Sequence, residues 1–505
     1  MIPRAGVSAS SDLAADAGAR IAKDGGNAVD AAIAACLVSA VTEPGMVALG
    51  AGGYVVIWPS EGNPIAIDGG VEMPGRGLSA DRFGMGAETV HLDYFDGTDA
   101  LVGAGTVATP GALAAFAEAS ARFGRMPWRE LMLPAIEVVK AGFPMRPPSH
   151  RYLTASHQLI FGREPESFAA IHDNAGELLS IGDAIHVPHL ADSLQLIADE
   201  GVSAFYRGDL AVAIAACIKE GQGILTREDL AAYQPIVSEP MRYTLGPLQL
   251  ASAAPSAIGG SLLGVMVTQA EQGMPDSEPW GSEWLQRVVE IQNDVLGYRA
   301  KVLDVSPDFG DQARAYFHQQ LGVGKDSAST VHNSVVDSQG NACSITLSAG
   351  YGSGVMPPGT GIWLNNCLGE LELNCTGFHS LPPATRLLSN MAPTTGRSVA
   401  GEVLSLGSPG SGRITTAQFQ TLLNLVVLEW PLEKAIAHPR VHVTQAGPQP
   451  LVHIEPGLTP FEGGIRWHPM DQLDTYFGGV GAVMLKTDSM EAATDCRRSG
   501  AVGFA

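Results

Sequence analysis

The sequence predicts a large α+β protein with a layered fold, and the order of its segments is the basis of this prediction. Helical spacing of apolar residues dominates before about residue 240, whereas strand-like runs are concentrated around 240–250 and 330–410. A doubly wound sheet would require strict alternation of strands and helices, and that alternation is missing. The 505 residues can bury a large core, and no internal repeat or low-complexity linker divides the chain.

The N-terminal part is expected to begin with two helices. Residues 11–23 have helical spacing, and Asn27 is placed to cap an alanine-rich helix that continues to Val41. Alanine side chains are small, so this helix can pack closely on several sides and should be buried. The next expected elements are strands at 54–58 and 65–67 and helical stretches at 111–141 and 191–219.

Thr226 and Asp229 have the spacing of a capping box and should begin another helix. The last predicted strand and the last predicted helix are joined by a glycine-rich turn at 407–412. Backbone N–H groups at such a turn can form an anion pocket, although a glycine turn without a ligand is the commoner case. The expected elements of this half are strands at 241–250, helices after Gly260 and at 286–303, strands at 334–347, 361–364 and 403–406, and a helix from Ile414.

Charge and composition exclude several classes of function. A net charge of −22 argues against nucleic-acid binding, because no basic run is denser than Arg497-Arg498. The longest apolar run, residues 31–41, is far shorter than the roughly 20 residues that a membrane-spanning helix needs. The six cysteines are scattered, and the N-terminus has no secretory signal pattern. We therefore expect a cytoplasmic protein without a membrane partner.

No cofactor or metal motif is complete. The stretch 322–326 resembles the end of a phosphate-binding loop, but Asp326 stands where a Ser or Thr would hold magnesium. The glycines at 50–53 lack the spacing of a dinucleotide site. Neither the cysteines nor the thirteen histidines have zinc-site spacing, and a G-x-S-x-G turn is missing. The sequence thus predicts no cofactor and no metal.

Thr330 is the best nucleophile candidate that remains. A polar, small-residue run ends at Ser329, and Thr330 then opens an apolar strand that should form a hairpin through residues 337–341. If the bond between Ser329 and Thr330 were cut, Thr330 would gain an α-amine with a pKa near ~8 beside its hydroxyl. One residue would then supply nucleophile and base. Taken alone, a Thr at this position is far more often a β-branched residue that starts a strand.

Four separated stretches together resemble the γ-glutamyltranspeptidase family of N-terminal-nucleophile hydrolases. They are Gly25–Ala32, Thr330–Asp337, Gly361–Asn366 and Gly407–Gly410, in the order of the family. The resemblance covers nearly the whole chain. It implies a precursor that cuts itself between Ser329 and Thr330, with a large piece 1–329 and a small catalytic piece 330–505. Both pieces would be interleaved in one four-layer αββα sandwich.

The resemblance also implies the catalytic roles. Thr330 would attack an amide carbonyl with its freed α-amine as base, and water or an amine acceptor would resolve the acyl ester. The backbone amides of Gly410 and Ser411 would form the oxyanion hole. Ser348 lies where the family holds a second Thr that supports the nucleophile, and it keeps the hydroxyl. His332 is expected to help position the cut site rather than to act as a base.

The substrate-binding positions of the family are only partly kept. Glu370 falls where the family places an acid for the substrate ammonium, and Ser389 falls where a Ser contacts the carboxylate. Asn390 replaces a second Ser, and Asn366 belongs to the same predicted set. Gly70 stands where glutamyl-specific members carry an Arg that clamps the substrate carboxylate. Without this charge-assisted pair, a glutamyl substrate should lose several kcal/mol of binding free energy.

Three hypotheses follow. The first is a self-processed Thr amidohydrolase or acyltransferase that acts on a small non-glutamyl amide, similar to oxamate amidohydrolase. The second is an ordinary γ-glutamyltransferase or glutathione hydrolase in which Arg76 or Arg386 replaces the missing clamp. The third is an uncut relative that binds a ligand without catalysis, which the kept Thr330 and Ser348 argue against. The acyl donor, the balance of hydrolysis and transfer, the efficiency of the cut and the oligomeric state, including a homo-oligomer, stay open.

Overall fold

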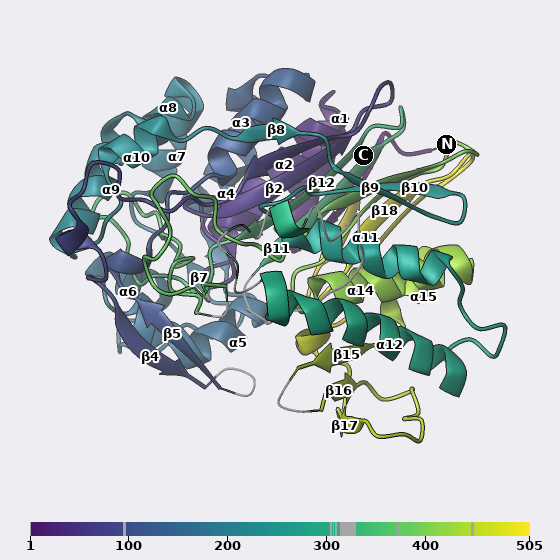
Figure 1. The fold of residues 1–505 in the computed structure, drawn as a ribbon. Helices are drawn as coiled ribbons and strands as arrows, with labels where there is room; N and C mark the ends of the chain where they lie inside the picture. The colour runs from purple at the N-terminus through teal and green to yellow at the C-terminus, as the bar shows by residue number, and fades with distance from the viewer. Residues whose placement is uncertain are drawn as a thin grey trace.

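Two large antiparallel sheets face one another, and helices cover the outer side of each sheet (Figure 1). The computed structural model describes residues 2–93, 97–303, 306, 308, 311–313, 330–371, 373–374, 376–445 and 449–505. Within these residues the layers run helix, sheet, sheet, helix, so the predicted αββα sandwich is confirmed.

The first sheet contains, in the described part of the chain, seven strands in the order β20-β1-β11-β12-β2-β3-β8, and neighbouring strands are antiparallel. All residues of β1, β2 and β11 are buried, because helices cover one face of the sheet and the second sheet covers the other. The strands are β1 (Ala5–Ala9), β2 (Gly52–Trp58), β3 (Ile65–Gly69), β8 (Ile236–Ser238), β11 (Val331–Asp337), β12 (Ala342–Ser348) and β20 (Ala501–Phe504).

The second sheet has the strand order β19-β18-β14-β13-β10-β9 and is also antiparallel. Both sheets combine strands from before and after Thr330. Residues 1–329 and 330–505 are therefore interleaved, and a cut before Thr330 would leave both sheets built from two pieces. The strands are β9 (Met241–Leu245), β10 (Leu248–Ser252), β13 (Thr394–Ser398), β14 (Val403–Gly407), β18 (Gly481–Leu485) and β19 (Met490–Thr494).

Helices form the two outer layers. In the first layer every residue of α2 is buried, as its alanine-rich sequence predicts, and Asn27 and Asp30 form a capping box at its start. The helices on the first sheet are α1 (Asp12–Lys23), α2 (Ala28–Thr42) and α3 (Ala112–Phe123). The helices of the opposite layer are α11 (Ile258–Glu271), α12 (Ser282–Tyr298), α14 (Arg413–Leu422) and α15 (Leu432–Ala437).

Smaller elements surround this sandwich. Thr226 caps α10 through the predicted capping box with Asp229. No single described helix is long and apolar enough to cross a bilayer, and one pair bent by 113°, residues 190–200 with 203–220, meets the requirement by length and composition alone. The elements are α4 (Trp128–Ala141), α5 (Pro147–Ser156), α6 (Pro165–Ile171), α7 (Leu190–Glu200), α8 (Ser203–Tyr206), α9 (Asp209–Glu220), α10 (Arg227–Ala232), β4 (Glu88–Leu92), β5 (Thr98–Val102), β6 (Phe143–Pro144), β7 (Ala184–Ile185), β15 (Val441–Thr444), β16 (Leu451–Ile454) and β17 (Arg466–Pro469).

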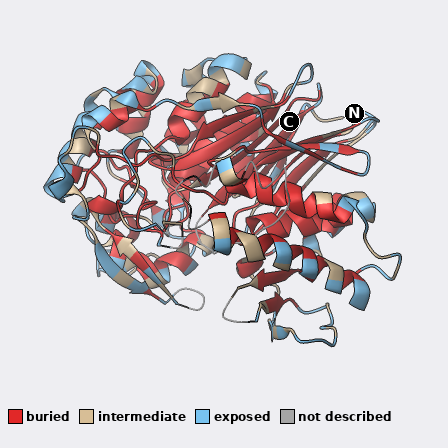
Figure 2. Ribbon diagram, in the orientation of Figure 1, coloured by how far each residue is buried: buried red, intermediate tan, exposed pale blue. Residues whose placement is uncertain are grey.

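Burial follows the layers. The sheets and the helix faces against them are buried, and exposed residues lie at the periphery (Figure 2). The two ends of the chain meet beside β1, where the Arg4 amide donates to the Ala505 carbonyl over 2.7 Å. Both termini are therefore tied into the edge of the first sheet.

The strand predicted at 361–364 is wrong. Gly361 has φ +66, and this stretch makes only an isolated bridge between Leu364 and Gly50. The neighbouring Asn365 side chain donates to the Gly50 and Ala108 carbonyls, and these bonds hold the segment as a loop instead of a ladder. The stretch still lies close to the site, because it leads directly to Glu370.

Candidate active site

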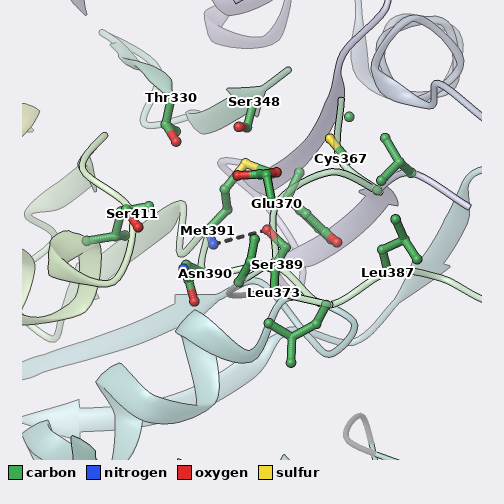
Figure 3. A pocket seen from close by; sticks show the side chains of 16 residues that line it. Thr330, Ser348, Cys367, Glu370, Leu373, Leu387, Ser389, Asn390, Met391 and Ser411 are labelled. Atoms are coloured by element: carbon green, nitrogen blue, oxygen red, sulfur yellow. Dashed lines mark hydrogen bonds between the residues drawn. The ribbon is translucent and has the colours of Figure 1, made fainter. Parts of the chain in front are cut away.

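Thr330 borders a pocket at one end of the first sheet, which we call the Thr330 pocket. Thr330 is 4% exposed and precedes β11 directly. In Figure 3 the hydroxyls of Thr330 and Ser348 point into the same space, with Glu370 below them and Ser411 to one side. The pocket is lined by Gly52, Tyr54, Gly70, Val71, Thr330, Ser348, Cys367, Glu370, Leu373, Leu387, Leu388, Ser389, Asn390, Met391, Ser411 and Ile414.

The register of one hairpin brings Thr330 and Ser348 together. Val331 pairs with Leu347 across β11 and β12, so the residues just outside this pair lie at the same end of the hairpin. Ser348 also pairs with Gly52 of β2, which fixes it inside the sheet. Position 52 has no room for a side chain, because a Cβ there would lie 2.8 Å from a Val71 methyl group.

The turn after β14 has an unusual backbone. Gly410 has φ +122, and the next residue, Ser411, has φ +62, a region that side-chain-bearing residues seldom adopt. Such strain persists only where the surrounding structure enforces it, and it is common at functional sites. The turn leads into α14, whose N-terminal N–H groups favour negative charge. Ser411 lines the Thr330 pocket and Gly410 stands directly before it.

A second loop packs against this turn and leaves no room for a side chain. A Cβ on Gly410 would lie 2.5 Å from the Gly478 Cα. The 478 loop is itself fixed, because Arg440 donates to the Phe477 carbonyl and pairs with Asp495 over 2.6 Å. Burial raises the pKa of Asp495, but Arg440 and a second arginine outweigh this effect and hold the pKa below its usual value. The turn is therefore held by a fully buried ion pair.

Three more polar side chains line the pocket, those of Glu370, Ser389 and Asn390. Glu370 is 2% exposed. Burial raises the pKa of the neighbouring Cys367 thiol, and the Glu370 carboxylate raises it further. The Ser389 hydroxyl accepts a hydrogen bond from the Met391 amide over 3.2 Å. Neither polar atom of the Asn390 carboxamide has a hydrogen-bond partner among the described residues, although Asn390 is buried. A buried amide without partners can bind a ligand at little desolvation cost.

The structure brings together most of the predicted site residues. Asn366 is not among the lining residues, since its side chain donates to the Leu101 carbonyl and its backbone amide donates to Ala349. Asn366 thus holds the loop that carries Glu370. The cut-site residue Ser329 lies outside the described residues.

His332 is held as a neutral side chain. It is buried on β11 between two hydroxyls, with Nδ1 2.9 Å from Thr346 Oγ1 and Nε2 2.7 Å from Ser334 Oγ. Burial lowers its pKa to about 3. A ring that is saturated with hydrogen bonds and difficult to protonate is a poor general base, which agrees with the expectation that it serves structure.

The two arginines that could replace the missing clamp are already paired. Arg386 donates to Glu72 over 2.7 Å and to the Gln234 carbonyl over 2.6 Å, and its guanidinium lies over the Tyr233 ring. Arg76 donates to the same Glu72 over 3.0 Å and to an aspartate of α10 over 3.2 Å. Neither arginine lines the Thr330 pocket.

Tyr54 is a lining residue that the sequence did not single out. A strand was predicted at 54–58, but Tyr54 was not among the candidate site residues. The pairing of Tyr54 with Asp68 between β2 and β3 places its hydroxyl beside Gly70, the position of the missing Arg. This neighbourhood depends on the register of two strands, which the residue pattern alone did not specify.

Comparison with known proteins identifies the family. The family model described as gamma-glutamyltranspeptidase matches residues 14–505. The glutathione hydrolase proenzyme of Pseudomonas aeruginosa is 30% identical, covering 98% of this chain and 93% of the relative. The acylase ACY 1 proenzyme of Pseudomonas sp. strain V22 is 29% identical, covering 96% and 91%.

Solved structures support the same fold. The crystal structure of cephalosporin acylase from Bacillus halodurans superposes with a TM-score of 0.81 and 23% sequence identity, covering 99% of this chain and 96% of that chain. At this identity the likeness concerns the fold. The family match spans nearly the whole chain, and it agrees with the four stretches quoted above. The protein is therefore an enzyme of the gamma-glutamyltranspeptidase family.

Proposed function

We propose that this protein cuts its own chain before Thr330 and then uses Thr330 as the nucleophile of an amidohydrolase or acyltransferase. Its substrate would be a small amide whose acyl group is not glutamyl. The composition of the Thr330 pocket is the main support. Thr330, Ser348 and Ser411 contribute hydroxyl-bearing residues to it, and Glu370 is the one charged side chain among the described residues that line it.

The reaction would proceed in two steps. The free α-amine of Thr330 takes the Oγ proton, and Oγ attacks the amide carbonyl, whose oxygen gains a negative charge beside the N–H groups of Gly410 and Ser411. The C–N bond then breaks, and the leaving amine takes the proton from the α-ammonium. Water or a second amine attacks the Thr330 ester, passes its proton through the α-amine and releases the acyl group.

Charge in the pocket favours an acyl group that carries an amine. The Glu370 carboxylate is buried and can pair with an ammonium group, whereas a substrate carboxylate meets no described cationic side chain in the lining. Burying an unpaired carboxylate costs several kcal/mol. Arg76 and Arg386 are held by acidic partners, so moving either one toward a substrate would break a buried ion pair.

Glutathione hydrolysis is the second candidate, and the 30% identity with the P. aeruginosa glutathione hydrolase proenzyme favours it. Its substrate carries both an amine and a carboxylate on the acyl group. The pocket provides a charged partner for the amine and no cationic partner for the carboxylate among its described lining residues. The two candidates therefore predict opposite effects of a carboxylate on the acyl group: it should lower kcat/KM for the first and raise it for the second.

Four p-nitroanilides that share a butyryl chain and differ in the groups at its end separate these candidates. The butyryl amide has neither group, the γ-aminobutyryl amide has the amine, the glutaryl amide has the carboxylate, and the γ-glutamyl amide has both. We expect kcat/KM for γ-aminobutyryl to exceed that for γ-glutamyl by at least ~10-fold, the size of one lost charged contact. The opposite order would favour glutathione hydrolysis. A Thr330→Ala protein serves as the blank.

A further inference from the structure

We propose that Tyr54 determines the acyl specificity of the Thr330 pocket. Its hydroxyl is oriented as a hydrogen-bond acceptor, which selects acyl groups that carry a donor and rejects those that carry a carboxylate. This inference rests on the proposed function, in that the Thr330 pocket holds the acyl group. It adds a residue and a substrate class that neither the motifs nor the resemblance supplied.

The Tyr54 hydroxyl occupies the space beside Gly70. Tyr54 lines the pocket from β2 and is 2% exposed. A Cβ on Gly70 would lie 2.3 Å from the Tyr54 Oη and 2.8 Å from Asp68 Oδ1, closer than real Cβ contacts occur. A side chain at position 70 and the observed position of Tyr54 are therefore incompatible. The Tyr54 phenol therefore lies beside the position where glutamyl-specific members of the family carry an Arg.

The direction of the hydrogen bonds behind Tyr54 follows from the available protons. Asp68 as a carboxylate can only accept, and the Ser256 hydroxyl donates to its Oδ2 over 2.9 Å. Ser256 has a single proton, so in its 2.7 Å contact with Tyr54 it must accept, and Tyr54 must donate. The Tyr54 proton thus points away from the pocket, and the remaining lone pairs of its oxygen are left for the pocket side and for Ser389, which also hydrogen-bonds to it.

A fixed set of charges holds this chain of hydrogen bonds. Asp68 Oδ1 accepts from the Gly70 amide over 2.7 Å and lies 3.4 Å from Arg386 Nε. Arg386 is anchored in turn by Glu72. Burial, and the nearby Asp68 after it, raise the pKa of Tyr54 and keep the phenol protonated. The acceptor character toward the pocket is therefore set by residues that do not touch the ligand.

This orientation defines a class of acyl groups. Tyr54 and Glu370 both offer oxygen acceptors to the same pocket, and an ammonium group can donate to both. A carboxylate has no proton to donate and would meet two oxygen acceptors. The substrate class is thus an amide with an amino-substituted acyl group that lacks a carboxylate.

The Tyr54→Phe variant removes the acceptor and keeps the ring. With the four p-nitroanilides, we expect kcat/KM for γ-aminobutyryl to fall ~10-fold, the value for butyryl to stay within ~2-fold and the value for glutaryl to rise. Tyr243→Phe is the matched control, since Tyr243 is a buried tyrosine of β9 outside the pocket lining. It should leave all ratios unchanged. An unchanged ratio of γ-aminobutyryl to glutaryl in Tyr54→Phe would overturn the inference.

A second variant and a binding readout keep the two proposals distinguishable. Ser256→Ala removes the acceptor for the Tyr54 proton, so the proton can turn toward the pocket and the rejection of glutaryl should weaken. Calorimetry with the product acids γ-aminobutyrate and glutarate measures the same preference without turnover. Absent turnover of the p-nitroanilides together with preferred γ-aminobutyrate binding that Tyr54→Phe abolishes would contradict the proposed function alone. Equal binding of the two acids by the wild-type protein would contradict the role of Tyr54.

Discussion

Arg386 Nη1 lies 2.7 Å from the Glu72 carboxylate, inside a cluster that also includes Asp68 and the Tyr233 ring. Burial lowers the pKa of Arg386, but Tyr233, Asp68 and Glu72 outweigh this effect and raise it above its ordinary value. The guanidinium is thus a structural cation behind the wall of the Thr330 pocket.

Replacing Arg386 should affect stability more than specificity. Arg386→Met leaves Asp68 and Glu72 without their shared cation, and breaking a buried pair in this way costs about 3–5 kcal/mol. Urea unfolding of the purified protein measures this loss. Arg386→Lys keeps the charge and should retain the ranking of the four amides. If Arg386→Lys instead raised KM for γ-glutamyl amides alone, Arg386 would bind the substrate carboxylate and would not be a purely structural cation.

The oxyanion turn provides a backbone test. Gly410→Ala must move the turn away from Gly478, and losing one oxyanion donor typically lowers kcat by about 10²–10³. Gly401→Ala is the matched control. Gly401 also has a positive φ, +89, but a Cβ there would meet no atom within 4 Å.

Both variants place an alanine at a positive φ, so a loss of kcat confined to Gly410→Ala would place the effect at the turn. Equal activities of the two variants would remove the turn from the reaction.

The hydroxyl of Ser348 should assist the nucleophile. Ser348→Ala removes it from the pocket beside Thr330, and we expect kcat to fall ~10-fold while KM changes little, since the hydroxyl acts on the attacking group. Ser348→Thr restores a hydroxyl and should recover most of the rate. Steady-state kinetics with a p-nitroanilide that the wild-type enzyme hydrolyses measures kcat and KM of both variants. A Ser348→Ala enzyme with unchanged kcat would show that this hydroxyl has no part in the reaction.

Stability should fall on acidification because of His332. Its folded-state pKa of about 3 lies below the ordinary value of 6.5, so between these values the unfolded chain binds a proton that the folded chain does not. The free energy of unfolding is then unaffected above about pH 6.5 and decreases by about 1.4 kcal/mol for each pH unit below it. His438, whose pKa burial lowers to about 4, adds to the same slope.

Thermal unfolding from pH 7 to pH 5 measures this slope. A His332→Gln variant should have a flatter acid slope than the wild type, even if it is less stable at neutral pH. An identical slope in both proteins would mean that His332 is protonated in the folded state.

The sequence predicted the layered fold and most of the elements around the site, because long helices and the Thr330 hairpin have strong local patterns. It did not reveal β1, although Ala5–Ala9 lies inside the first sheet, since a short run of small residues has no strand signature. It also placed a strand at 361–364, where a positive-φ glycine and Asn365 side-chain bonds maintain a loop.

The site was predictable to the extent that it depends on neighbours in the chain. Thr330, Ser348 and the Gly410 turn occur in recognisable stretches. Tyr54 and Asp68 come together with Ser256 through strand register and a segment almost two hundred residues away, which no local pattern encodes. The pairing of Arg386 was equally hidden, and it turns a candidate clamp into a structural residue.

Self-processing at Thr330 is the central claim, and intact mass analysis of freshly purified protein tests it most directly. Wild-type protein should give two fragments that begin at Met1 and Thr330, and Thr330→Ala should give one uncut chain. A single uncut chain in both samples would contradict the account, because Thr330 would then have no α-amine to act as a base.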